Sequence, residues 1–103
     1  MSSDHEILEL RSLALARAVV QKIDADPTRA ALAHARQRCS QWLSQRPNPY
    51  LEEWEKILTG NWNEIRQVLT DESPRCRELR QNNPFSGVLT PRERWAIYRD
   101  AQS

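Results

Sequence analysis

The chain has 103 residues, which suits one domain with one hydrophobic core. Its 15 basic and 14 acidic residues leave a formal charge of +1, which excludes a global electrostatic pull towards nucleic acid or an anionic membrane. Cys39 and Cys76 lie too far apart in sequence for a zinc knuckle or a redox motif, and the sequence shows neither an apolar leader nor an apolar run long enough for a membrane span, so we expect a cytoplasmic protein.

The first predicted helix covers residues 3–24, which contain no glycine or proline. Its larger apolar residues cover more of the helix circumference than the roughly 100° stripe of an ordinary surface helix. We therefore expect this helix to lie centrally in the fold or to use a second face for a partner. These apolar residues are Ile7, Leu8, Leu10, Leu13, Leu15, Val19, Val20 and Ile23.

Two proline-containing segments predict the next helix starts. Asp26 can cap a first turn in which Pro27 takes the first helical position, so a second helix is expected to begin there. Pro47 ends that helix, and Asn48 and Pro49 form the start of a short third helix. The apolar residues that recur at helical spacing in the second helix are Leu32, Ala35, Cys39, Trp42 and Leu43.

Three further helices follow. Gly60 is expected to end the third helix in the left-handed conformation, and Asn61 and Glu64 have the spacing of a capping box for a fourth helix. Ser73-Pro74 begins a fifth, and residues 82–87 read as a loop. Thr90-Pro91-Arg92-Glu93 is a second capping-box pattern that opens the last helix. No strand-like alternation occurs, so the sequence predicts an all-α fold: a compact bundle of five or six short helices in a single domain, residues 1–103.

Residues for catalysis are sparse. His5 and His34 have no carboxylate or thiol at a spacing typical of a catalytic triad or a metal site. Gly60 and Gly87 are the only glycines, so neither a P-loop nor a dinucleotide-binding fingerprint can be written. We therefore expect a protein that is not an enzyme and that needs no cofactor or metal.

Charge is unevenly distributed along the chain. Residues 46–72 contain three basic and six acidic side chains, whereas residues 73–103 contain six arginines and three acidic side chains. The two segments can attract each other within the fold, which is the favoured interpretation. Alternatively, the arginine-rich segment faces an acidic partner.

The segment from Asn82 to Arg99 contains the residue types that are enriched at interface hot spots. The competing interpretation is that its aromatic residues close the core, and for Trp95 taken alone this is the favoured interpretation. The arginines beside them favour an interface for the segment as a whole. The residues predicted to bind a partner are Phe85, Arg92, Arg94, Trp95, Tyr98 and Arg99.

Part of this segment, Leu89-Thr90-Pro91-Arg92-Glu93-Arg94, resembles the opening of the helix-turn-helix domains of response regulators. In that family about 50 further residues, including the recognition helix, follow this opening, whereas nine residues follow Arg94 here. We interpret the match as a shared helix-start pattern. A basic and aromatic patch for nucleic acid remains the alternative.

Residues 83–99, together with Tyr50-Leu51-Glu52-Glu53-Trp54, resemble a group of short bacterial proteins, some of which are similar to the small helical antitoxins of toxin–antitoxin pairs. The resemblance implies a non-enzymatic protein that binds and masks a partner enzyme, the toxin. Two alternatives stay open: a small DNA- or RNA-binding regulator that uses the C-terminal arginines, and a homo-oligomeric structural protein.

Overall fold

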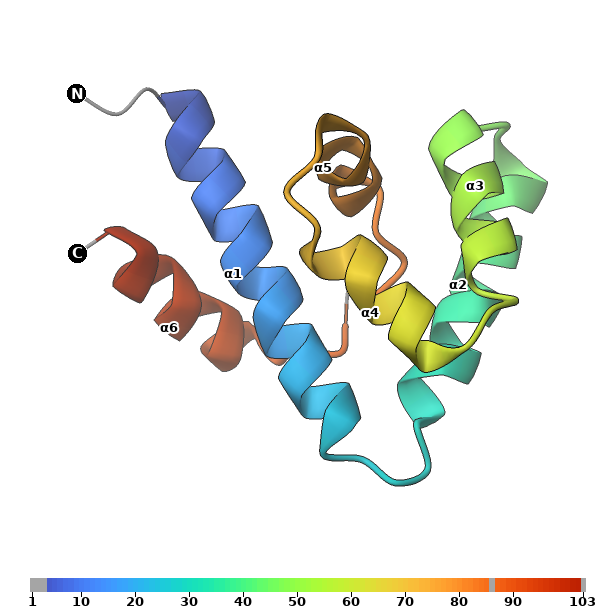
Figure 1. Ribbon diagram of the computed structural model, residues 1–103, viewed down its shortest axis with the longest axis horizontal. Helices are drawn as coiled ribbons and strands as arrows, with labels where there is room; N and C mark the ends of the chain where they lie inside the picture. The colour runs from blue at the N-terminus through green and yellow to red at the C-terminus, as the bar shows by residue number, and fades with distance from the viewer. Residues whose placement is uncertain (1–3, 86, 103) are drawn as a thin grey trace.

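The computed structural model describes residues 4–85 and 87–102, which form six helices and no strand. The helices are α1 (Asp4–Asp24), α2 (Ala30–Gln45), α3 (Pro49–Ile57), α4 (Trp62–Thr70), α5 (Pro74–Gln81) and α6 (Pro91–Gln102). Figure 1 shows α1 between α6 on one side and α4 and α5 on the other, with α2 and α3 farthest from α6. The prediction of an all-α bundle of about six short helices is confirmed.

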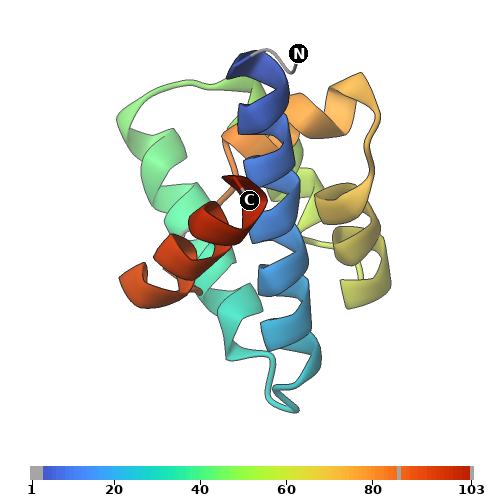
Figure 2. The same ribbon diagram turned by 90° about the vertical axis from the view of Figure 1, so that its left-hand side faces the viewer.

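Helix α1 is the central element. It contacts α4, α5 and α6, and Figure 2 shows α6 crossing it on the outside of the molecule. Its buried side chains are Leu13, Ala16, Val19, Val20 and Ile23. Nearer the N-terminus, Leu8 and Leu10 are 59% and 57% exposed. The broad apolar surface of α1 therefore serves the core along most of the helix and stays uncovered at one end. No described helix meets the length and hydropathy that a membrane crossing requires.

The centre of the core is an aromatic pair. The rings of Trp54 and Phe85 meet edge to face with their centroids 6.0 Å apart. The indole Nε1 of Trp54 donates a hydrogen bond of 2.7 Å to the backbone oxygen of Leu79, so its buried polar atom has a partner. The pair links α3 to α5 and to the loop that leads to α6.

Side-chain caps start the middle helices where the sequence predicts them. The Asn48 side chain accepts hydrogen bonds from the backbone N–H groups of Tyr50 and Leu51, at the start of α3. Asn61 accepts from the N–H of Glu64 in α4, and Ser73 caps α5 in the same way. Each cap satisfies an N–H that has no partner within its helix.

Two local predictions are wrong. Helix α2 begins at Ala30 instead of Pro27, because the Asp26 carboxylate accepts hydrogen bonds from both the backbone N–H and the hydroxyl of Thr28 and so closes a turn. Gly60 does not adopt the left-handed conformation; in the described chain, positive φ angles occur only at Arg29 and Gly87. The N–H of Gly60 instead donates to the Ile57 oxygen, and α4 begins at Trp62.

Candidate protein-interaction surface

The outer side of α6 carries Arg92, Trp95 and Arg99. Their spacing of three and four residues places them on one side of the helix. All three are exposed, and 66% of Trp95 is accessible to solvent. We call these three side chains the α6 face. An indole exposed between two guanidinium groups is a typical interface anchor.

The start of α6 is fixed by a complete capping box. The N–H of Thr90 donates to the Glu93 carboxylate over 2.8 Å, and the N–H of Glu93 donates to the Thr90 hydroxyl over 3.1 Å. Lys22 of α1 donates to the same Glu93 oxygen over 2.7 Å. These hydrogen bonds, first that from Lys22 and then that from Thr90, lower the pKa of Glu93 from 4.5 to about 2.

Side-chain packing then holds α6 against α1. Ile97 packs on the core, and the guanidinium carbon of Arg11 lies 5.5 Å from the ring centroid of Tyr98. The side of α6 that faces α1 is thus covered by contacts within the chain. The α6 face remains available to a second molecule.

The structure divides the sequence-predicted residues into three groups. Arg92, Trp95 and Arg99 are exposed together, so the core interpretation favoured for Trp95 taken alone is wrong. Arg94 and Tyr98 are half-buried beside α1. Phe85 is 2% exposed and belongs to the core, so the expectation that it is a surface anchor is wrong for the folded chain. Its packing against Trp54 matches the competing interpretation that an aromatic residue of this segment closes the core.

The six arginines of residues 73–103 also divide. Arg75 pairs with Glu53 of α3, as the attraction between the middle and final segments predicts. Arg77 and Arg80 instead pair with Glu9 of α1. Within the described residues, the ion pairs do not include the three arginines of α6. Both interpretations of the charge pattern therefore keep support: one arginine pairs with the middle segment, and those of the α6 face point to solvent.

Two clefts flank the exposed end of α1. One, of about 290 Å³, lies between α1 and α5 and contains Glu6, Glu72 and Arg77 in its walls. The other, of about 460 Å³, is bounded by α1, α6 and the chain after α5, and includes Leu8, Arg11 and Tyr98. Arg80 and Glu9 line both clefts. The sequence draws attention to the wide apolar surface of α1, but no signal in it singles out Arg11 or Arg80.

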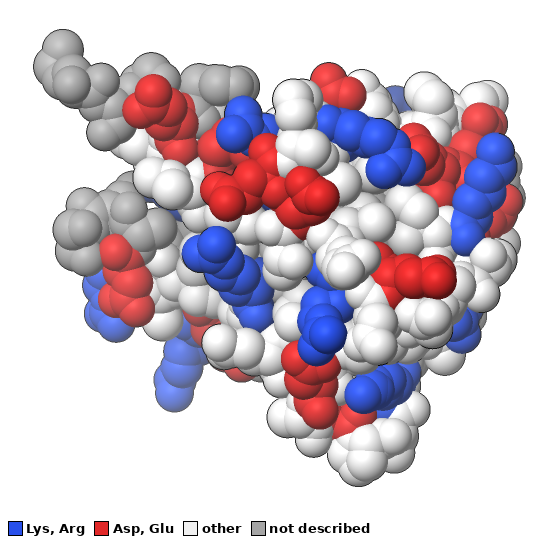
Figure 3. All heavy atoms as spheres, in the orientation of Figure 1, with Lys and Arg blue, Asp and Glu red and all other residues white. Residues whose placement is uncertain are grey.

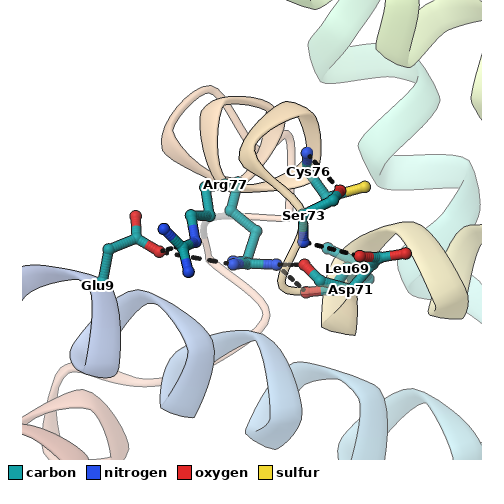
Figure 4. Close-up of polar contacts among 7 residues, drawn as sticks. Glu9, Leu69, Asp71, Ser73, Cys76 and Arg77 are labelled. Atoms are coloured by element: carbon teal, nitrogen blue, oxygen red, sulfur yellow. Dashed lines mark hydrogen bonds and ion pairs between the residues drawn. The ribbon is translucent and has the colours of Figure 1, made fainter. Parts of the chain in front are cut away.

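Figure 4 shows polar contacts that join α1, α4 and α5. An oxygen of Glu9 lies 3.4 Å from Nε of Arg77 and 3.7 Å from Nη2 of Arg80. Nη1 of Arg80 donates to the backbone oxygens of Leu69 and Asp71, at the end of α4. Backbone oxygens at a helix C-terminus carry partial negative charge, which favours a guanidinium. Arg80 thereby joins α5 to both α1 and α4.

The buried Cys39 thiol is not activated. The Cys39 thiol donates to the Leu51 oxygen over 3.2 Å, and burial raises its pKa, which disfavours the reactive thiolate. Cys76 is also buried and forms no disulfide. In the part of the chain that the structure describes, no three or more His, Cys, Asp or Glu side chains gather where they could hold a metal ion. The His5 side chain lies outside the described part.

The α6 face thus stands out as a surface with recognition chemistry and no internal partner for its charges among the described residues. The Thr90-Pro91-Arg92-Glu93 motif at its base forms the helix cap. Comparisons of the chain with protein-family models, with curated proteins and with solved structures find no match.

Proposed function

We propose that this chain is a non-enzymatic protein-interaction module that binds a partner protein through the α6 face and the adjoining end of α1. The observation that carries the proposal is the exposure of Trp95 between Arg92 and Arg99. Trp and Arg are the residues in which interface binding energy concentrates, and a rigid helix loses little conformational entropy when they are covered. Exposed Leu8 and Leu10 add apolar surface on α1.

The partner that we propose is an enzyme whose activity the chain masks, as an antitoxin masks its toxin. This part of the proposal rests on the resemblance of residues 83–99 to antitoxin-like bacterial proteins. Within those residues Trp95 and Arg99 are available for contact, whereas Phe85 supports the loop from inside. A masking protein needs a stable scaffold with an exposed anchor, and α6 combines a fixed start with an uncovered outer side.

Nucleic acid is the second candidate, since arginines beside an exposed aromatic ring also suit phosphates and stacked bases. The charge distribution favours a protein. Figure 3 shows basic and acidic side chains interspersed over the face that it presents, without a continuous basic field. Sequence-independent binding to nucleic acid needs such a continuous basic surface.

Co-purification from the native host with a double variant of the α6 face tests the proposal. Trp95→Ala and Arg99→Ala together should abolish partner binding and leave far-UV helicity unchanged. The matched control is Trp42→Ala, which removes a half-buried indole from α2, remote from α6, and should retain the partner. Added back, the chain should inhibit the enzyme that it captures.

Three outcomes would count against the proposal. Retention of the partner by the double variant would remove the α6 face from the interface. Global unfolding of that variant would show that the α6 face supports the fold. A salt-sensitive retardation of DNA or RNA that the double variant loses would favour the nucleic-acid candidate.

A further inference from the structure

The larger cleft beside α1 is lined by two arginines from distant parts of the chain. Arg11 comes from α1 and Arg80 from the end of α5. Around them lie the hydroxyl groups of Ser12 and Tyr98 and the amide of Asn83. A volume of about 460 Å³ is enough for one or two amino-acid side chains.

Arg80 is the unusual member of this group. Only 1% of its side chain is exposed, and its two terminal nitrogens face the α4 carbonyl oxygens and Glu9. Its Nε is buried and has no hydrogen-bond partner among the described residues. Buried donors are almost always paired in folded proteins, so this Nε–H is an unsatisfied donor beneath the cleft wall.

Arg11 repeats the same feature. Its Nε is also buried without a hydrogen-bond partner in residues 4–85 and 87–102. The ring of Tyr98 lies against its guanidinium group, which limits the directions that the side chain can take. Two positively charged side chains thus line one cleft, and each has a buried Nε–H without a partner among the described residues.

The charge of the cleft identifies the acceptor. Among the described residues that line the cleft, Glu9 is the one carboxylate beside Arg11 and Arg80, and Arg77 outside the cleft shares it with Arg80. The cleft therefore has a surplus of positive charge. A planar carboxylate can accept two parallel hydrogen bonds from a guanidinium, and such charge-assisted pairs are stronger than neutral ones.

We propose that this cleft receives an Asp or Glu side chain of the partner protein, which binds the half-buried Arg11 and is attracted by the positive charge of Arg80 behind the cleft wall. An apolar residue next to that carboxylate contacts Leu8 and Leu15 at the cleft wall. The proposal deepens the proposed function and rests on it, because Tyr98 belongs both to the cleft and to the helix that carries the α6 face. It gives the partner a stated chemistry, an acidic residue beside an apolar one.

Nuclear magnetic resonance of the full chain tests the cleft without the partner. The probe is the capped dipeptide N-acetyl-leucyl-glutamate amide, and its neutral control carries glutamine instead. The acidic probe should shift the signals of Ser12 and Asn83 and bind at least tenfold more tightly than the neutral one. Equal binding of both probes would overturn the proposal.

A pair of variants on α1 locates the effect. Arg11→Gln should weaken binding of the acidic probe at least tenfold. Arg17→Gln, the matched change at an exposed position of the same helix, should leave it unaltered. Arg80 is not substituted, because it also donates hydrogen bonds to the end of α4 and its loss would destabilise the folded chain. Unchanged binding by the Arg11 variant would remove the cleft as the site.

Further probes separate this proposal from its alternatives and from the proposed function. Saturable shifts with inorganic phosphate or a short oligonucleotide, and none with the acidic dipeptide, would overturn it. If the dipeptide does not bind, and the partner is lost with Trp95→Ala but kept with Arg11→Gln, the cleft proposal fails alone. If the dipeptide binds and no protein partner is captured, the proposed function fails.

Discussion

Phe85 and Trp95 are both large aromatic residues of the segment between α5 and the C-terminal helix, but they are 2% and 66% exposed. Phe85 follows a turn in which the Asn83 side chain accepts a hydrogen bond from its backbone N–H over 2.7 Å. That turn directs the ring into the core, where it contacts Trp54. Trp95 instead belongs to the outer side of α6. Aromatic character alone therefore does not assign a residue of this segment to the core or to the interface.

Substitution of the two residues should separate their roles. Phe85→Ala leaves a cavity next to Trp54 and should lower the free energy of unfolding by about 3–5 kcal/mol. Trp95→Ala removes a mostly exposed side chain and should change it by no more than about 0.5 kcal/mol. Urea unfolding followed by far-UV circular dichroism measures both. A Trp95 variant as destabilised as the Phe85 variant would show that the indole supports the fold.

Residue exposure was only partly predictable from the sequence. The spacing of Arg92, Trp95 and Arg99 predicts that they share one side of a helix, but it does not show whether that side is covered, and the core was wrongly favoured for Trp95 taken alone. Phe85 has no such periodicity, because its direction depends on the turn at Asn83. Arg80 was equally unpredictable, since its burial requires the carbonyl oxygens at the end of α4 to lie beside it.

At the scale of the element, helix starts were predicted well where a cap and the first turn are adjacent in sequence. Asn48, Asn61, Ser73 and Thr90 each cap the expected helix. The start of α2 was missed because Asp26 bonds to Thr28 and closes a turn before the helix begins. The two outcomes begin from similar residues, because an Asp side chain can either cap a helix or close a local turn by bonding to the backbone two residues ahead.

The capping box of α6 also predicts how stability depends on pH. The folded chain lowers the pKa of Glu93 from 4.5 to about 2, so it favours the charged carboxylate. The stability that this gives is present above pH 4.5 and is lost as the pH falls towards 2. Glu93→Gln should therefore have a lower free energy of unfolding than the parent protein at pH 6. This difference in stability should become smaller as the pH falls from 4.5 towards 2.

Urea midpoints at pH 6, 4 and 3 measure that difference. Asp26 and Asp71 add acid sensitivity to both proteins, because hydrogen bonds from Thr28 and Ser73 also lower their pKa values. The comparison with the glutamine variant cancels their contribution. A difference that stays constant from pH 6 to pH 3 would contradict the role given to the Glu93 charge.

Across the whole molecule, stability and recognition occupy different parts. The buried apolar side chains of the described core come from α1 to α5 and from the loop through Leu89. Helix α6 adds the partly buried Ile97, its contact with Arg11 and its ion pair with Lys22. Such an element can present an exposed anchor without exposing the core. Its outer surface can therefore vary with the partner at little cost to the fold.

Two shortened chains test this separation. A chain of residues 1–90 keeps Phe85 and Leu89 and should still unfold cooperatively. Its free energy of unfolding should be lower by about 2–4 kcal/mol, because it lacks the contacts of one or two partly buried α6 side chains. It should bind no partner. A chain of residues 1–81 lacks both core side chains and should show no cooperative transition in urea. If residues 1–90 also failed to fold, α6 would be part of the core, and the loss of binding by its variants would reflect unfolding.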